Sequence, residues 1–162
     1  MTLTVYTAGE VLTALSLNDN FTFAAANGGK IIQVVEGASN TSASSTSATY
    51  VDTGLTVSIT PTLATSKILV FAAHTVYTSA NATSCAIRIV RDSTTLTQSI
   101  DQSYTPSGGG LISTWSLMDL DSPATTSATT YKTTFARNSG AGTVTVNSGS
   151  NASRIIVMEV SA

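Results

Sequence analysis

The sequence predicts an all-β protein: a jelly-roll-like antiparallel β-sandwich over residues 30–162, preceded by a short helical or extended N-terminal arm over residues 1–29. Ser and Thr together make up about a third of the chain, whereas charged residues make up only 10% against about 25% in an ordinary domain. Threonine fits a half-buried pleated surface and serine suits turns. From Lys30 onward apolar and polar residues alternate with period two, and the apolar runs recur at roughly ten-residue spacing, as in a sandwich or jelly roll.

Eight or nine short strands follow from this alternation. Leu55, Val57 and Ile59 alternate with polar residues, so their strand has one buried face. The run 67–77 is apolar on both faces, which indicates a central strand covered on two sides. Residues 37–48 are almost wholly small or polar and are expected to form a loop. The strands are expected at 31–36, 55–60, 67–77, 84–91, 95–101, 111–120, 129–137, 142–147 and 154–160.

The predicted core consists of apolar side chains on these strands. They are Leu55, Val57, Ile59, Ile68, Val70, Phe71, Ile87, Ile89, Trp115, Leu117, Phe135, Val144 and either Ile156 or Val157.

The N-terminal arm carries the helical signal of the chain. Thr7 and Glu10 fit a capping box, but the helix that follows is too short to be stable alone. Gly28-Gly29 is expected to form a flexible joint to the strands. We therefore expect the arm to mediate attachment, with its apolar side chains on another protein or a neighbouring subunit; in the alternative, the arm folds back and plugs one end of the sandwich. These side chains are Tyr6, Val11, Leu12, Leu15 and Phe21.

Composition argues against several partners and compartments. The net charge is −2 and the seven Lys and Arg residues are scattered, so no basic stripe is available to neutralise phosphates and we expect no nucleic acid partner. No apolar run approaches the length of about 20 residues that spans a bilayer, and no signal peptide begins the chain, so we expect no membrane association and a protein that stays in the cytoplasm where it is made.

Candidate catalytic and metal-ligating residues are few. The single histidine, His74, lies on an apolar strand and is expected to be a core or interface residue rather than a general base. Cys85 is expected to be an inert, buried thiol. Asp119 and Asp121 share a strand face and could bind Ca²⁺ with backbone carbonyls, but a polar strand end is the simpler interpretation. One Cys and one His cannot form a closed zinc site. We expect no enzyme activity, no cofactor and no metal.

Residues 6–21 and six stretches between residues 50 and 160 carry a resemblance to virion proteins of bacteriophages. The N-terminal stretch, residues 6–21, resembles a segment common at the start of phage virion proteins. The body resembles β-rich domains of head-decoration and fibre proteins, especially those of cyanobacterial and other aquatic phages, in residues 50–55, 59–61, 66–70, 121–123, 130–132 and 155–160. The resemblance implies a homotrimer arranged around a three-fold axis, with the N-terminal segment bound to the major capsid protein or to a tail platform protein.

Two functions are compatible with this resemblance. The first is a trimeric capsid decoration (cement) protein, located on the virion, that binds and stabilises the capsid surface; the chain lacks the repeats with which a fibre gains reach. The alternative is a short tail fibre or receptor-binding tip that recognises a host cell-surface glycan. A glycan-binding tip favours aromatic residues on loops, whereas Trp115 and Phe135 lie in predicted strands and only Tyr104, before Thr105-Pro106, is well placed in a loop. A glycan depolymerase is disfavoured because it requires paired carboxylates in a cleft.

Overall fold

The protein is described by a computed structural model, which places residues 31–102, 109–148 and 152–161. These residues form strands and connecting loops, without an α-helix among them. The predicted arm, residues 1–29, lies outside the described residues. The strands are β1 (Ile31–Ser39), β2 (Ala43–Ser45), β3 (Val51–Ile59), β4 (Lys67–Thr78), β5 (Ser84–Arg91), β6 (Thr94–Gln102), β7 (Leu111–Asp121), β8 (Thr129–Ser139), β9 (Val144–Val146) and β10 (Ser153–Val160).

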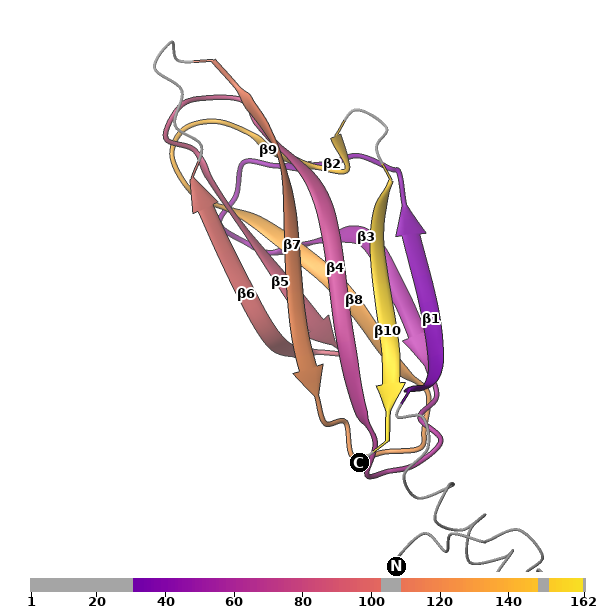
Figure 1. Ribbon diagram of the computed structural model, residues 1–162. Helices are drawn as coiled ribbons and strands as arrows, with labels where there is room; N and C mark the ends of the chain where they lie inside the picture. The colour runs from indigo at the N-terminus through magenta and orange to yellow at the C-terminus, as the bar shows by residue number, and fades with distance from the viewer. Residues whose placement is uncertain (1–30, 103–108, 149–151, 162) are drawn as a thin grey trace, which may run out of the picture. The chain divides into compact units, whose positions relative to one another are not determined.

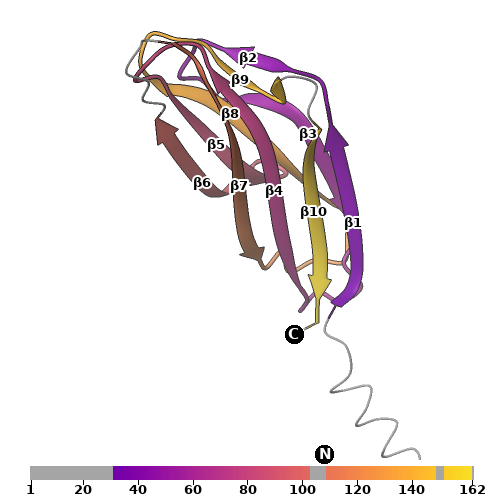
Figure 2. The ribbon, with the colours of Figure 1, turned by 45° about the horizontal axis from the view of Figure 1, so that its top comes forward.

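The strands form two antiparallel sheets that face each other (Figures 1 and 2). Sheet A contains β1, β10, β4 and β7 in that order, and sheet B contains β3, β8, β5 and β6. The short strands β2 and β9 extend sheet A at one end. β10 pairs with residues 67–73 of β4 and β9 pairs with residues 76–78 of the same strand, so β9 and β10 are two parts of one interrupted strand.

The same reasoning joins β1 to β2, because β1 pairs with β10 and β2 pairs with β9. When β1 with β2 and β9 with β10 are each counted as one strand, the described residues form eight strands, four in each sheet. Along sheet A the strands are then the first, eighth, third and sixth of the chain, and along sheet B the second, seventh, fourth and fifth. This is the strand order of a jelly roll, two Greek keys folded onto each other. The predicted fold class is therefore confirmed.

The core between the sheets contains the side chains that the alternation places inward. Of the predicted core residues, all are buried except Phe71, with Val157 rather than Ile156 as the buried member of that pair. Phe71 is 39% exposed, so its prediction is wrong. Because Ile68 and Val70 point inward, Phe71 must point to the opposite face of β4, and within this chain nothing covers that face among the described residues. The second cover that the sequence predicts for β4 is therefore not supplied by the described residues of this chain.

The end of β10 is fastened by a buried carboxylate. Glu159 is fully buried and accepts hydrogen bonds from Gln33 Nε2 at 2.6 Å, from the Thr62 backbone N–H at 2.7 Å and hydroxyl at 3.0 Å, and from the Leu63 N–H at 3.3 Å. Burial raises the pKa of this carboxyl, but the hydrogen bonds, led by that from Gln33, outweigh it and lower the pKa to about 2. The charged group therefore ties β10 to β1 and to the loop after β3.

Within the described residues, no helix has the length and apolarity that a membrane crossing requires.

Candidate functional sites

The outer face of sheet A is apolar across all four strands. Val34 of β1 lies beside Met158 of β10, Met158 beside Leu69 of β4, and Leu69 beside Leu120 of β7. The next row places Phe71 between two further apolar residues. We call the whole set the sheet A patch: Val34, Leu69, Phe71, Met118, Leu120, Ile156 and Met158.

Exposure distinguishes this patch from scattered surface hydrophobics. Met118 is 65% exposed, Val34 56% and Leu120 51%. A shallow hollow of about 310 Å³ lies at the edge of the patch, lined by Phe71, Ala72, Ala73, Ser116, Arg154 and Ile156. An ion pair between Glu36 and Arg154 borders it. A contiguous apolar area with a charged border is typical of a protein–protein contact surface.

The outer face of sheet B is polar. One row crosses all four strands: Asp52 of β3 lies beside Thr134 of β8, Thr134 beside Arg88 of β5, and Arg88 beside Gln98 of β6. The Arg88 guanidinium lies 3.4 Å from the centre of the Tyr50 ring. Arg88 Nε and the Tyr50 hydroxyl both donate to Gln98 Oε1, at 2.7 and 2.9 Å. These contacts hold the side chains in a fixed array.

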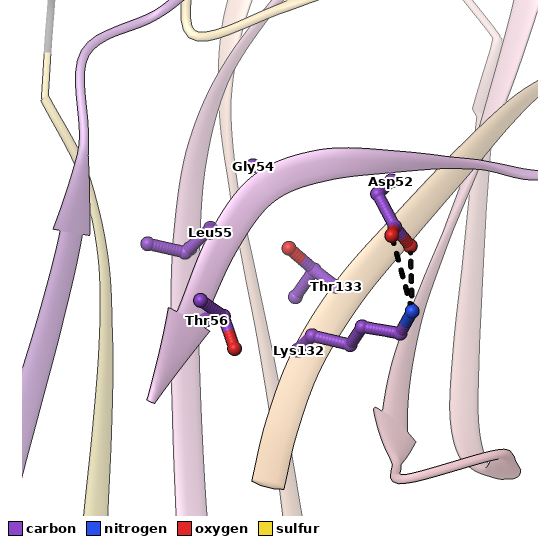
Figure 3. A pocket seen from close by; sticks show the side chains of 6 residues that line it. All are labelled: Asp52, Gly54, Leu55, Thr56, Lys132 and Thr133. Carbon is purple, nitrogen blue, oxygen red and sulfur yellow. Dashed lines mark hydrogen bonds and ion pairs between the residues drawn. The ribbon is translucent and has the colours of Figure 1, made fainter. Parts of the chain in front are cut away.

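A bulge in β3 opens a hollow beside this row (Figure 3). The pairing passes from Asp52–Thr134 to Thr56–Lys132, so three residues of β3 lie opposite Thr133 alone. Gly54 sits in the bulge with φ +80°, a conformation that favours glycine. The hollow measures about 170 Å³ and is lined by Asp52, Gly54, Leu55, Thr56, Lys132 and Thr133.

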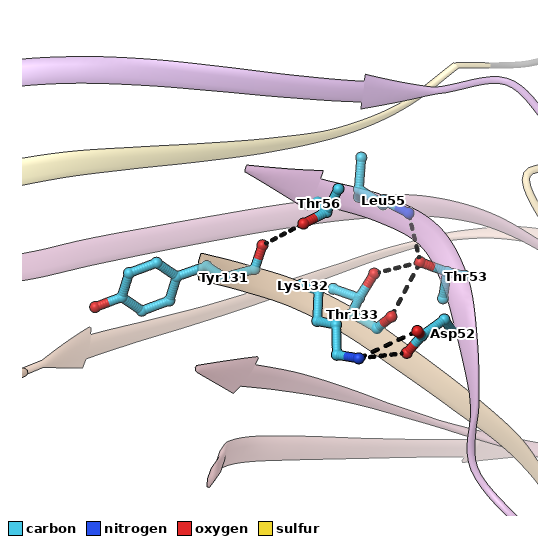
Figure 4. A network of polar contacts seen from close by, with 7 residues as sticks. All are labelled: Asp52, Thr53, Leu55, Thr56, Tyr131, Lys132 and Thr133. Atoms are coloured by element: carbon cyan, nitrogen blue, oxygen red, sulfur yellow. Dashed lines mark hydrogen bonds and ion pairs between the residues drawn. The ribbon is translucent and has the colours of Figure 1, made fainter. Parts of the chain in front are cut away.

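An ion pair forms one wall of the hollow. Lys132 Nζ lies 2.9 Å from Asp52 Oδ1 and 3.1 Å from Oδ2. The Thr56 hydroxyl on the neighbouring wall donates to the Tyr131 carbonyl at 3.3 Å. Figure 4 shows the Asp52–Lys132 pair together with the hydrogen bonds of Thr53 and Thr56. Since the pair is exposed, it contributes little to stability, and both groups are accessible.

Beneath the hollow, a chain of buried polar groups crosses the sandwich. The hydroxyls of Thr53 and Thr133 lie 2.6 Å apart, Thr133 Oγ1 lies 2.9 Å from His74 Nε2, and His74 Nδ1 lies 3.2 Å from Asn147 Oδ1. All four residues are at most 2% exposed. Because an amide oxygen can only accept, Nδ1 carries the proton and Nε2 accepts from Thr133.

Asn147 connects the interrupted strands of sheet A. Its side-chain N–H groups donate to the Thr41 carbonyl at 2.8 Å and the Thr53 carbonyl at 3.0 Å, and its oxygen accepts from Ser153 at 2.5 Å. This arrangement fixes the amide orientation and thereby the tautomer of His74. The network lies in the core, so His74 is a buried core residue, as the sequence predicts. No pattern in the sequence indicates the network itself.

The two acidic residues at the end of β7, Asp119 and Asp121, bond to different partners and do not form a shared metal site. Asp121 is buried and accepts two hydrogen bonds from Arg91 Nη1, at 2.6 and 2.7 Å, and one from the Tyr131 hydroxyl at 2.7 Å. Asp119 accepts from the backbone N–H of Leu120. Within the described residues, no group of three His, Cys, Asp or Glu side chains could hold a metal ion. Asp121 instead links sheet A to sheet B.

Cys85 is fully buried, and burial, followed by the nearby charge of Asp101, raises the pKa of its thiol to about 12. A thiol with such a pKa is not a nucleophile at neutral pH. The predicted attachment residues Tyr6, Val11, Leu12, Leu15 and Phe21 lie outside the described residues, as does the loop residue Tyr104.

Comparison with known proteins gives matches in structure only. No protein-family model and no curated protein matches the sequence. The insecticidal δ-endotoxin Cry8Ea1 of Bacillus thuringiensis is similar at a TM-score of 0.34 and 17% identity, over 76% of this chain and 19% of the toxin chain. The VP2 subviral particle of infectious bursal disease virus is similar at a TM-score of 0.38 and 14% identity, over 80% of this chain and 38% of that chain.

A structure of the Gx strain of the same virus has a TM-score of 0.37 and 12% identity, over 82% of this chain and 37% of that chain. The present chain thus spans less than two fifths of each of these three proteins. Likenesses of this degree carry no argument about function, and the jelly-roll description rests on the strand order of this chain.

Proposed function

We propose that this protein is a structural, non-enzymatic component of a virus particle: a capsid decoration protein that forms a homotrimer and stabilises the capsid surface. The observation that carries the proposal is the sheet A patch. The patch spans four strands, which lie about 4.8 Å apart, and two rows of side chains, which lie about 7 Å apart along the strands. Its area is therefore a few hundred Å². Monomeric proteins rarely leave a larger apolar area in water.

A second copy of the same chain is the occupant that we propose for this patch. Stable subunit contacts bury about 800 Å² on each partner, with an apolar centre and a polar rim. The patch supplies such a centre, and the Glu36–Arg154 pair supplies part of a rim. Only 10% of the residues are charged, which limits repulsion between copies. The resemblance of the sequence to phage virion proteins supports three copies and a particle-bound role, with the major capsid protein as the partner.

Light scattering on the purified full-length protein tests the oligomeric part of the proposal. We expect the mass of a trimer at micromolar concentration. A monomer under these conditions would contradict self-association through sheet A. The decoration role is tested by the copy number per virion: a cement protein covers a capsid in hundreds of copies, because its stabilising effect is multivalent.

A short tail fibre or receptor-binding tip is the second candidate. The observation that favours it is the polar outer face of sheet B, with its accessible hollow and the fixed array around Tyr50 and Arg88. A copy number of a few tens or fewer per virion would favour this candidate over a decoration protein.

A further inference from the structure

The hollow over the β3 bulge is preformed. Its shape follows from the backbone, because residues 53–55 lie opposite one residue of β8 and Gly54 holds a left-handed conformation. Its floor is Thr133, which is fully buried and fixed by the hydroxyl of Thr53 and by His74. A ligand entering this site would not have to order it first, and preorganisation of this kind favours binding.

The charges at the hollow select for a neutral ligand. Asp52 and Lys132 form an ion pair whose charges cancel, so a charged ligand would meet one group of its own sign. The carboxylate accepts hydrogen bonds and the ammonium donates them. Adjacent hydroxyl groups on a sugar ring present a donor and an acceptor side by side and therefore match this pair. The Thr56 hydroxyl lines the same hollow and can bond to a third position.

Size and surroundings favour a saccharide over other neutral polar molecules. The volume of about 170 Å³ lies below the roughly 300 Å³ of the smallest drug-sized pockets, so it suits a single ring. Thr134, Arg88 and Gln98 continue the polar surface across the sheet, with the Arg88 guanidinium over the Tyr50 ring. A second sugar unit would find hydrogen-bonding partners along this row.

We propose that this hollow binds a neutral saccharide, with Asp52 and Lys132 bonding to adjacent hydroxyl groups and Thr56 to a third. The site lies on sheet B, whereas the proposed subunit contact lies on the outer face of sheet A. The inference does not rest on the virion role, and its failure would leave that proposal in place.

Nuclear magnetic resonance titration of the ¹⁵N-labelled full-length protein tests the inference. The probes are glucose, galactose, mannose, rhamnose, fucose and N-acetylglucosamine. Each is titrated to a concentration of about 10 mM, which would nearly saturate a site with a dissociation constant of about 1 mM. We expect at least one sugar to shift the amide signals of Asp52, Thr56 and Lys132 in a saturable way. If none does so, or if the shifts map elsewhere on the molecule, the inference is wrong.

Two variants and two matched controls complete the test. Asp52→Asn and Lys132→Met each remove one charge-assisted hydrogen bond and should weaken binding about tenfold. Asp101→Asn on β6 and Lys67→Met on β4 each remove an exposed charge that does not line the hollow, and should leave binding unchanged. Glucuronate and N-acetylneuraminate serve as anionic probes. Tighter binding of either anion than of every neutral sugar would overturn the assignment of a neutral ligand.

Discussion

His74 is the single histidine of the chain, and its buried position keeps its imidazole neutral. Burial lowers its pKa below the ordinary value of 6.5, and the hydrogen bond to Asn147 offsets only part of this effect. Protonation would place a second proton on Nε2, where the Thr133 hydroxyl now donates. The acid form therefore requires the Thr133 hydroxyl to change from donor to acceptor, and it leaves a buried charge without a counterion among the groups that contact His74.

We expect the imidazole of His74 to titrate below pH 6.5, as the Nδ1–H tautomer. Because the folded pKa is lowered, the unfolded chain binds the proton first. The neutral imidazole of His74 therefore contributes fully to the free energy of unfolding above pH 6.5. This contribution is lost as the pH falls from 6.5 towards the pKa of the folded state, by at most about 1.4 kcal/mol per pH unit. Nuclear magnetic resonance of ¹⁵N-histidine-labelled protein measures the pKa and the tautomer directly. A pKa at or above 6.5 would contradict this account.

Glu159 is the opposite case, a buried group that stays charged. Its four hydrogen bonds come from neutral donors, and they stabilise the carboxylate more than burial destabilises it. We expect Glu159→Gln to lower the free energy of unfolding at pH 7 by about 2 kcal/mol, since hydrogen bonds to a charged group are lost and the amide N–H faces donors.

The pH dependence has a definite sign. The folded pKa of Glu159 is about 2 and the ordinary value is 4.5, so its contribution is present above pH 4.5 and is lost as the pH falls towards 2. Urea denaturation at a series of pH values should show the wild-type protein and the Glu159→Gln variant converging over this window. Glu36→Gln is the matched control, because Glu36 is exposed and should change stability by less than about 0.5 kcal/mol. A constant difference down to pH 2 would refute the assignment.

At the scale of elements, hydrophobic alternation predicted most of the strands. It failed for β2, because Ala43, Ser44 and Ser45 are small or polar and carry no apolar signal. This strand exists because β9 pairs with it over three residues. Its position depends on a partner about a hundred residues away, which no local pattern contains.

The inward and outward faces were harder to predict than the strands. β4 is apolar on both faces, so alternation alone could not tell that Phe71 points outward. In β8 the inward Thr133 and the outward Thr134 are the same residue type, and β-branched threonine is compatible with both faces. Asn147 likewise resembles a turn residue in sequence. Its role as the centre of a buried network depends on Thr41, Thr53 and Ser153, which only the fold brings together.

The N-terminal arm is the element whose function we predict most sharply. We expect Leu12→Asp with Leu15→Asp to abolish binding to the virion, because these apolar side chains would make the attachment contacts and a carboxylate is costly to bury. Thr13→Asp on the polar side of the predicted helix is the control. Cosedimentation of each full-length protein with particles that lack the native copy measures attachment.

Deletion of residues 1–28 separates attachment from folding. We expect the truncated protein to keep its β-sheet circular dichroism spectrum and to lose particle binding. Normal decoration by the truncated protein would contradict attachment through the arm. A truncated protein that no longer folds would instead favour an arm that plugs the sandwich.

At the scale of the whole molecule, the two outer faces differ in chemistry, apolar on sheet A and polar on sheet B. We expect Met118→Asp to convert the proposed trimer to monomers, because it places a charge among the exposed apolar side chains of sheet A, where a subunit contact would desolvate it. Thr95→Asp on the exposed edge strand of sheet B is the control. Light scattering reports the mass of each protein, and an unchanged trimer in Met118→Asp would exclude the patch from the contact.

The pairing of β1 with β10 has a mechanical consequence. Ile31 lies beside Val160, so the chain enters and leaves the sandwich at the same end (Figure 1). A force applied to these two points would open the β1–β10 ladder one hydrogen bond at a time, like a zipper, and would meet little resistance. A force between Ile31 and the turn after β4, at the far end, would load the bonds along β1 together in shear. The domain should therefore withstand tension along its length far better than tension between its own two ends.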